Sequence, residues 1–374
     1  MSISPSHAPL PAGARIAVLT SGGDAPGMNP ALRAAVKMGI ARGHAMLGVL
    51  NGYRGLIDGR ARVLSSADVD GIERLGGTFL GSARALDFAT PAGQAAATAS
   101  IARLQIDALV VIGGNGSLAG AHAAAAFSTA GDGRLRVVGI PASIDNDIGL
   151  TTSAIGVDSA LNTIVEACDK IADTASSHNR AFLVEVMGRD CGYLAMAAAV
   201  ATGADGVLFR ESGRSDEELV GHVVRVIESA FHRDPPKPRV LILKAEGVRA
   251  PLAELKARID AALAARRIGV ETRITVLGHL VRGGAPTAQD RLMAGRLARA
   301  AMWALIEGHS DAMIAWQGGA ATSAAAQVSP HDPYCAVVPI EAVLAETRAL
   351  LDGTSALVRW RTRAIAEVEE LLQL

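Results

Sequence analysis

The chain has few aromatic residues and few cysteines for its size. Only 3% of its 374 residues are Phe, Trp or Tyr, although half are hydrophobic. Its interior must therefore be built from Ala, Val, Leu and Ile, which suits close packing of helices on sheets. The 3 cysteines are odd in number and show no CxxC spacing. They argue against a disulfide framework or a structural zinc site and favour a reducing compartment.

An excess of one charge and long apolar runs are lacking as well. The 36 Lys and Arg against 37 Asp and Glu leave a net charge of −1, so no overall field attracts nucleic acid or an anionic membrane. No apolar run reaches 18 residues, and the N-terminal stretch MSISPSHAPLPAGAR has no continuous apolar core of a signal peptide. We therefore expect a cytoplasmic protein with neither nucleic acid nor membrane as a partner.

The chain does have a regular alternation of short apolar runs with helical segments. The runs are rich in β-branched residues and bounded by Gly or Pro, and they occur at 15–20, 45–50, 108–114, 135–141, 181–187, 206–210, 239–247, 272–279 and 312–317. Segments such as 29–43 and 161–177 between them have helical periodicity. This pattern predicts an α/β fold of two Rossmann-like domains, with mainly parallel sheets covered by helices on both faces.

The length of the chain predicts more than one core. We expect a disordered tail at 1–12. A larger domain is expected to combine 13–156 with about 282–335, and a smaller one to combine 157–281 with about 336–374. The last stretch, 358–374, reads as an amphipathic helix.

Ligands of open parallel sheets bind in the loops that follow the carboxyl ends of the strands. Two such loops hold glycine pairs, in TSGGDAPGMN (20–29) and in GGNGS (113–117). Such turns direct backbone N–H groups and a helix N-terminus at an anion, commonly a phosphate. In the first loop Asn29 and Pro30 are expected to cap and open a helix. A tight turn without any ligand stays the alternative for either loop taken alone.

Charged side chains follow other strands. PASIDND places Asp145 and Asp147 two residues apart, on one side of an extended loop, where one carboxylate could accept a proton and the other hold a metal. An Asx-type turn is the alternative. Arg189 and Arg282 lie in Gly-flanked loops, and arginine suits bidentate recognition of phosphate. His279 taken alone fits a packed or capping histidine better than a ligand.

Seven of these stretches, in order from about residue 15 to about 290, resemble successive motifs of the 6-phosphofructokinases. They are IAVLTSGGDAPGMN, GGTFLGSAR, VVIGGNGS, PASIDND, SSHNR, EVMGRDCGY and ETRITVLGHLVRGG. The resemblance implies transfer of the γ-phosphoryl group of MgATP to the 1-hydroxyl of fructose 6-phosphate, a step of glycolysis. It also implies that the larger domain binds ATP and the smaller one fructose 6-phosphate.

The resemblance assigns roles to individual residues. Asp145 would be the general base, supported by Asp147, Ser143, Arg84 and Arg189. The nucleotide would contact Gly22, Arg84, Ala85, Gly114, Asn115, Gly116 and Ser117, and Mg²⁺ would be held by Asn115 and Asp147.

The sugar phosphate would be bound by a third set, namely Ser143, Asp145, Arg180, Met187, Gly188, Arg189, Glu246, Arg273, His279 and Arg282. In the family the counterparts of Arg180 and Arg273 reach in from a neighbouring subunit. The resemblance therefore implies a homo-oligomer, a dimer or a tetramer, with shared active sites.

Three departures from the family pattern leave alternatives open. Asn115 replaces the Asp of GGDGS, Ala85 stands where an aromatic residue is common, and Ala172 stands where bacterial relatives often carry an effector-binding arginine. A pyrophosphate-dependent member typically has an acid and a Lys where this chain has Gly116 and Ala142, so ATP is favoured. A non-catalytic paralogue that senses sugar phosphates is favoured by Asn115 alone. A general sugar or lipid kinase would explain only the GGNGS loop.

Overall fold

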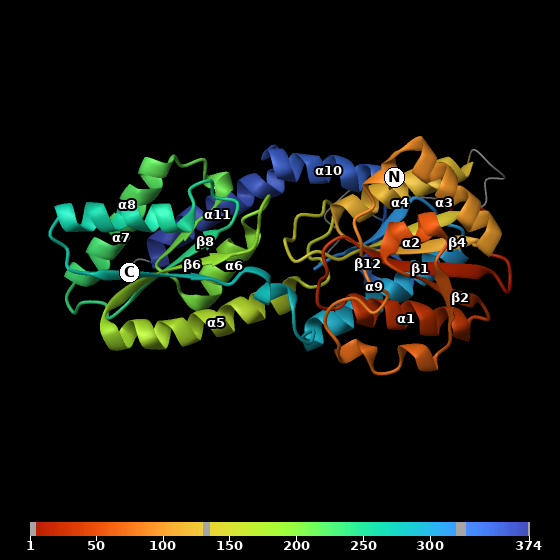
Figure 1. The fold of residues 1–374 in the computed structure, drawn as a ribbon, viewed down its shortest axis with the longest axis horizontal. Coiled ribbons are helices and arrows are strands. Elements are labelled where there is room, and N and C mark those ends of the chain that lie inside the picture. Colours follow the sequence, from red (N-terminus) through yellow and green to blue (C-terminus); the bar gives the residue numbers. More distant parts are fainter. Residues whose placement is uncertain (1–4, 130–134, 319–326, 373–374) are drawn as a thin grey trace. The chain divides into compact units, whose positions relative to one another are not determined.

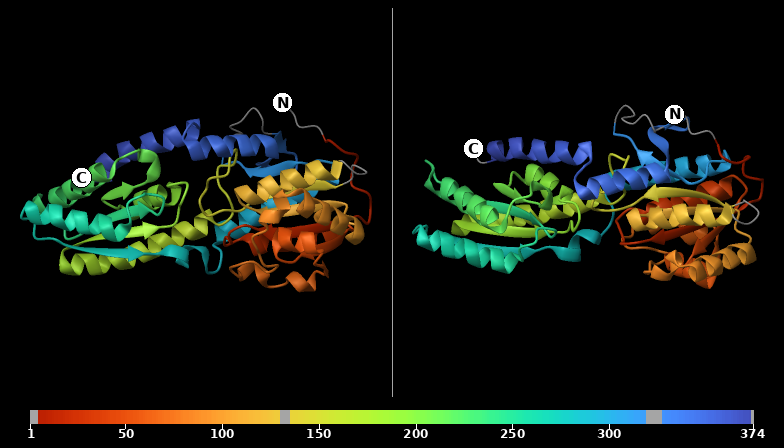
Figure 2. Two further views of the ribbon diagram at one scale, coloured as in Figure 1. Left: turned by 45° about the horizontal axis from the view of Figure 1, so that its top comes forward. Right: turned by 90° about the horizontal axis from the view of Figure 1, so that it is seen from above.

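The protein is described from a computed structural model that covers residues 5–129, 135–318 and 327–372. The chain forms two compact units (Figures 1 and 2). Unit 1 holds the residues up to Ile144, together with Ile148–Ser159 and Arg282–Arg348. Unit 2 holds Asp145–Asp147, Ala160–Val281 and the residues from Ala349 onward.

Unit 1 is built on a sheet of eight strands in the described part of the chain, in the order β11-β12-β10-β5-β4-β1-β2-β3. The strands are β1 (Arg15–Ser21), β2 (Ala45–Val49), β3 (Ala61–Leu64), β4 (Ala108–Gly113), β5 (Arg136–Pro141), β10 (Ala312–Trp316), β11 (Gln327–Ser329) and β12 (Asp332–Pro339). The strands from β10 to β2 pair in parallel. Every residue of β4 and β5 is buried, as expected for strands covered on both faces.

Helices cover both faces of this sheet. The helices of unit 1 are α1 (Met28–Ala41), α2 (Gly52–Asp58), α3 (Pro91–Leu104), α4 (Asn115–Thr129), α9 (Ala288–Ile306) and α10 (Ile340–Asp352), the last of which ends in unit 2. Helices α1 and α9 pack side by side on one face, and α2, α3 and α4 form a contiguous layer on the other (Figure 1). Three short 3-10 helices, Ala67–Val69, Ile72–Arg74 and Leu86–Ala89, lie between β3 and α3.

Unit 2 is built on a parallel sheet in the order β7-β8-β6-β9. Its strands are β6 (Arg180–Val186), β7 (Gly206–Leu208), β8 (Val240–Ala245) and β9 (Glu271–Val276). Its helices are α5 (Val157–His178), α6 (Tyr193–Thr202), α7 (Asp216–His232), α8 (Leu252–Ala265) and α11 (Ala356–Leu372), with 3-10 helices η4 (Arg210–Ser212) and η5 (Gly278–Arg282). The first residues of α5 and the last residue of η5 belong to unit 1. Helices α7 and α8 share one core with β6, β7 and β8. Helix α6 connects β6 to β7 and so crosses the sheet in the direction opposite to α7 and α8. Because such crossovers are right-handed, α6 lies on the other face.

The predicted α/β class, with parallel sheets covered by helices, is confirmed, and each of the nine predicted runs contains a strand. Strands β3, β11 and β12 were not predicted. They pair antiparallel at the margins of the unit 1 sheet. The edge strand β3 leaves Val63 exposed, so it needs no continuous apolar run. Because β12 pairs with β10, the C-terminal crossing between units follows Arg348 rather than residue 335.

Part of the segment expected to be a disordered tail is placed against unit 1. The His7 amide donates to Gly308 O at 3.0 Å, and the Leu10 amide donates to Ile306 O at 2.9 Å. Leu10 is buried. Residues 1–4 of that prediction lie outside the described residues. Across the described ranges, none of the helices is both long and apolar enough to cross a membrane.

Candidate functional site

The GGNGS stretch is the N-terminus of a helix. Strand β4 ends at Gly113 and α4 begins at Asn115, and the Leu118 amide donates to Gly114 O at 3.0 Å. The first amides of a helix have no partner within it, so they can bind an anion. The Ser117 Oγ is buried and has no hydrogen-bond partner among the described residues. A phosphate oxygen would satisfy these donors.

The second glycine loop lies directly beside the first. A Cβ added to Gly22, whose φ is +84°, would lie 3.2 Å from Ser117 Oγ. A Cβ on Gly113 would lie 2.5 Å from the same oxygen. The approach of the two loops therefore depends on glycine at these positions. Gly116 differs, because a Cβ there would meet nothing within 4 Å. The fold of this chain therefore leaves open space at the side-chain position of residue 116.

The segment that carries Arg84 is fixed against these loops. The Ser82 hydroxyl donates to Gly22 O at 2.7 Å. Asn29 was expected to cap α1, but α1 starts at Met28 and Asn29 is buried. Its side-chain amide donates to Leu75 O at 3.0 Å and accepts from the Phe79 amide at 2.7 Å.

The two residues that follow in this segment, Arg84 and Ala85, differ in their exposure to solvent. The Arg84 side chain is exposed, and Ala85 is half-buried. Arg84 is therefore accessible to a ligand in solution.

Tyr53 supports the phosphate loop, although no sequence motif indicated it. Its hydroxyl donates to Ser117 O at 2.6 Å, and its ring lies 4.3 Å from that of Phe88. Burial raises the pKa of the Tyr53 hydroxyl well above its usual value. A Cβ on Gly120 would lie 2.6 Å from the tyrosine ring. The small residue at 120 is the feature of the sequence that accommodates Tyr53.

The PASIDND stretch turns instead of running extended. Asn146 has φ +49°, in the left-handed region, so the two aspartates are not on one side of a strand. Asp147 is 9% exposed, and the Asn146 carbonyl accepts a hydrogen bond from Arg361 Nη1 at 3.3 Å. In unit 1 the Ser143 amide donates to Ile155 O at 3.1 Å, and Ser143 lies beside Gly114.

Two strand-end loops of unit 2 are joined, because β6 and β8 are neighbouring parallel strands. The Glu246 amide donates to Val186 O at 2.9 Å, and the Gly247 amide donates to Gly188 O at 3.2 Å. This brings Met187, Gly188 and Arg189 next to Glu246. Met187 is buried, and Arg189 is exposed. Gly188 has φ +129°, a conformation that requires glycine.

Arg180 and Arg273 do not join this loop cluster. Both pair with Glu271, and the hydrogen bond from Arg180 lowers the pKa of that carboxyl. Arg180 starts β6, whereas Met187 follows the end of that strand. At the rise of an extended strand, the two ends of β6 are roughly 20 Å apart. Within one chain, Arg180 cannot reach a ligand held at Met187.

His279 and Arg282 were predicted together with the sugar phosphate residues. His279 is exposed on η5. Arg282 belongs to unit 1, where its Nη1 donates to Asp24 O at 3.1 Å and lies 2.8 Å from the Cβ that Gly23 would carry. The structure therefore places Arg282 against the first glycine loop, an arrangement that chain order did not reveal.

The described residues offer no group of three or more His, Cys, Asp or Glu that could hold a metal ion. The Asn115 Oδ1 accepts a hydrogen bond from Thr347 Oγ1 at 3.5 Å, and an amide oxygen is a group that can coordinate a hard cation. Such a donor set fits Mg²⁺, which usually arrives on substrate phosphates and takes only one or two protein oxygens.

Comparison with known proteins gives a consistent assignment. Residues 15–305 match the family model described as phosphofructokinase. The ATP-dependent 6-phosphofructokinase of Thermotoga neapolitana is 47% identical over 81% of this chain and 90% of its own length. That of Natranaerobius thermophilus is 43% identical over 80% and 88%, respectively.

Solved structures agree on the fold. Phosphofructokinase from Pichia pastoris in the T-state superposes with a TM-score of 0.83 at 32% identity, covering 97% of this chain but only 40% of that one. A pyrophosphate-dependent phosphofructokinase from Marinobacter aquaeolei, at 16% identity and a TM-score of 0.72, shares the fold.

Proposed function

This chain belongs to the phosphofructokinase family and phosphorylates fructose 6-phosphate with ATP, and we propose that Asp145 is the general base of that reaction. Its carboxylate accepts the proton of the sugar 1-hydroxyl while that oxygen attacks the γ-phosphorus. The bond from the γ-phosphorus to the bridging oxygen breaks, and ADP leaves. Fructose 1,6-bisphosphate is the product.

The nucleotide phosphates are assigned to unit 1. The observation that carries this proposal is the close approach of Gly22 to Ser117, where an added Cβ would lie 3.2 Å from the Ser117 Oγ, at the N-terminus of α4. The open space at Gly116 supports a nucleotide as the ligand. Arg84 is proposed to neutralise charge on the transferred phosphoryl group, and Ser143 to contact it.

The sugar is assigned to the joined loops of unit 2. Met187, Gly188 and Glu246 are proposed to fix the sugar hydroxyls, and Arg189 to neutralise phosphoryl charge. This is supported by the Gly247–Gly188 hydrogen bond, which holds the loops in register. His279 is proposed to bind the 6-phosphate. Arg282 is proposed to bind the 6-phosphate as well, from its position beside Asp24 O of the first glycine loop.

We infer a homo-oligomer with shared active sites. Arg180 and Arg273 are proposed to bind the 6-phosphate held by a second copy of the chain. The reason is the roughly 20 Å length of β6, which keeps Arg180 away from Met187 in its own chain. Glu271 holds both guanidinium groups together, so they can act as one anion-binding pair.

Mg²⁺ is proposed as the metal that accompanies ATP. Asn115 and Asp147 would hold it, and when bound it supplies positive charge to the phosphate oxygens. The enzyme is also proposed to be cytoplasmic, which the three free and buried cysteines support.

A steady-state comparison of donors and acceptors tests the proposal. ATP and pyrophosphate are compared as donors, each with fructose 6-phosphate and sedoheptulose 7-phosphate as acceptors. Turnover with ATP and fructose 6-phosphate but not with pyrophosphate is expected. Activity with pyrophosphate alone would assign the chain to the other donor class. Binding of fructose 6-phosphate without turnover at any Mg²⁺ concentration would identify a sensor.

A further inference from the structure

The C-terminal helix α11 touches the segment that carries the proposed base. Arg361 on α11 donates from Nη1 to the Asn146 carbonyl oxygen at 3.3 Å. Asn146 stands between Asp145 and Asp147 and has a left-handed backbone conformation. Arg361 therefore hydrogen-bonds the peptide group that joins Asn146 to Asp147.

The same guanidinium group makes a second contact. It lies 4.5 Å from the centroid of the Tyr193 ring, a cation–π distance. Tyr193 starts α6, shortly after the Met187–Arg189 loop, and the preceding Gly192 amide donates to Glu211 Oε1 at 2.8 Å. Arg361 thus bridges the aspartate segment and the first residue of the helix that follows the sugar loop.

Helix α11 is itself anchored two turns further on. Its Glu369 accepts from Arg214 Nη2 at 2.8 Å and lies 3.3 Å from His222 Nε2, and both partners flank or belong to α7. Glu369 is 5% exposed. A buried ionic contact within unit 2 therefore anchors the helix that carries Arg361.

We propose that Arg361 is a positioning residue for phosphoryl transfer, which fixes Asp145 and Asp147 through the Asn146 carbonyl. The proposal rests on the proposed role of Asp145 as base. Helix α11 lies beyond residues 15–305, the range that matches the family model. Arg361 does not touch substrate in this scheme. Its effect is on the orientation of the carboxylates, to which reactions of this kind are sensitive.

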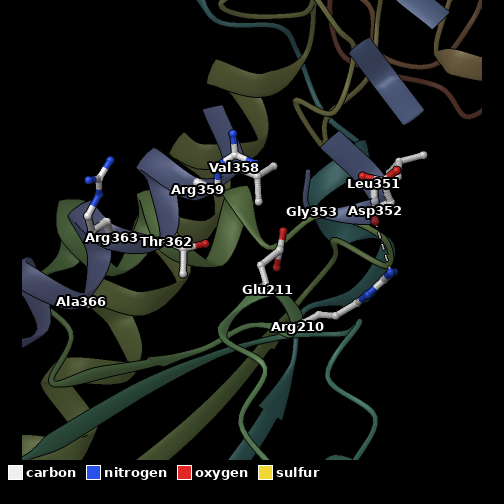
Figure 3. Close-up of a pocket in the computed structure, with 10 residues that line it drawn as sticks. All are labelled: Arg210, Glu211, Leu351, Asp352, Gly353, Val358, Arg359, Thr362, Arg363 and Ala366. Carbon is white, nitrogen blue, oxygen red and sulfur yellow. Dashed lines mark hydrogen bonds between the residues drawn. The ribbon is translucent and has the colours of Figure 1, made fainter. Parts of the chain in front are cut away.

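The helix supplies its own controls. Arg359 and Arg363 lie two residues before and after Arg361. They are four residues apart and therefore share a helix face, and Arg361 points to a different one. Both line a cavity of ≈ 530 Å³ beside η4. Figure 3 shows them along α11, with Glu211 and Arg210 coming from η4. Both are exposed.

The test compares Arg361→Met with Arg359→Met and Arg363→Met. Arg361→Met is expected to lower kcat by about 10- to 100-fold, because a misplaced catalytic group costs that much. The KM for ATP should stay within about twofold, since uniform binding is not affected. The two control variants should keep the parent kcat. Equal kcat losses in all three variants, or a change confined to KM, would overturn the proposal.

A second measurement distinguishes loss of positioning from loss of folding. Arg361→Ala is assayed with added guanidinium ion, which can occupy the vacated site between Asn146 O and the Tyr193 ring. Partial recovery of kcat with guanidinium, but not with sodium at equal ionic strength, is expected. If kcat is restored by neither while the melting temperature is that of the parent, the positioning role is wrong. If the parent shows no turnover at all, the proposed function fails instead.

Discussion

The Gly247 amide donates to the Gly188 carbonyl oxygen at 3.2 Å, and a Cβ on Gly247 would lie 2.1 Å from Arg189 O. Gly247→Ala must therefore displace the Met187–Arg189 loop. We expect a rise in the KM for fructose 6-phosphate of about tenfold or more, since a backbone hydrogen bond and its register are lost. The KM for ATP should change little.

The matched control for that variant is Gly295→Ala in α9. A Cβ at 295 meets nothing within 4 Å, and alanine is the better helix former. Steady-state kinetics of both variants and their thermal melts provide the comparison. An unchanged KM for fructose 6-phosphate in Gly247→Ala would remove this loop from the sugar site.

Gly116→Asp tests whether the open space at residue 116 serves the nucleotide. The fold has room for the side chain, so the free energy of unfolding should change by less than about 0.5 kcal/mol. A carboxylate beside the phosphates should lower kcat/KM for ATP by at least about tenfold. Gly116→Ala separates volume from charge and should retain more activity. Full ATP turnover in Gly116→Asp would argue that the nucleotide lies elsewhere.

Asn115→Asp tests how the amide contributes to metal use. The Thr347 hydroxyl can still donate to the new carboxylate, so the fold should tolerate the change. The added charge should lower the Mg²⁺ concentration for half-maximal rate several-fold, because carboxylates bind hard cations more strongly than amides do. Mg²⁺ titrations at fixed ATP measure this. An unchanged requirement would exclude Asn115 as a ligand.

Asp145→Asn tests the assignment of the base. The amide keeps the size of the side chain but cannot accept the hydroxyl proton. We expect kcat to fall by about 10²- to 10⁴-fold, the usual contribution of a general base, with little change in the KM for either substrate. Rapid-quench measurement of the chemical step, with Asp145→Glu as the companion variant, checks it. A kcat within threefold of the parent, on the order of measurement scatter, would reassign the base.

Glu369 is expected to make the free energy of unfolding fall at acid pH. Burial raises its pKa, but hydrogen bonds and charge from His222 and Arg214 lower it from 4.5 to about 2. A folded-state pKa below the unfolded one stabilises the fold above about pH 4.5, and this stability is lost as the pH falls toward 2.

Glu369→Gln measures that contribution directly. The variant should be less stable than the parent at pH 7, and the difference should shrink as the pH falls from 4.5 to 2. Urea unfolding at several pH values gives both curves. A difference that does not depend on pH would mean that packing, and not ionisation, carries the contribution of Glu369.

The sequence was most informative where strands are fully buried. Runs such as 108–114 gave strands because nothing but apolar residues fits a sheet covered on both faces. The margin of the sheet was missed for the opposite reason, since β3 leaves Val63 66% exposed. Antiparallel strands at an edge need no apolar run.

Local sequence patterns also failed where the partners of a residue come from distant parts of the chain. Asn29 is a residue type that often caps helices, but its side-chain amide instead hydrogen-bonds three backbone groups, those of Leu75, Gly76 and Phe79. The carbonyl oxygen of the turn residue Asn146 accepts a hydrogen bond from Arg361 of α11, which no local pattern connects with it. The chain order of Arg282 gave no sign of its contact with Asp24.

The length of β6 has a consequence for mixtures of damaged chains. Arg180 and Arg189 lie at opposite ends of that strand, so under the shared-site proposal one chain contributes them to different catalytic centres. A dimer that combines one Arg180→Ala chain with one Arg189→Ala chain would carry both defects in one centre and neither in the other. Two inactive proteins would complement each other when subunits exchange, and a loss in one gene copy could be masked by a different loss in another.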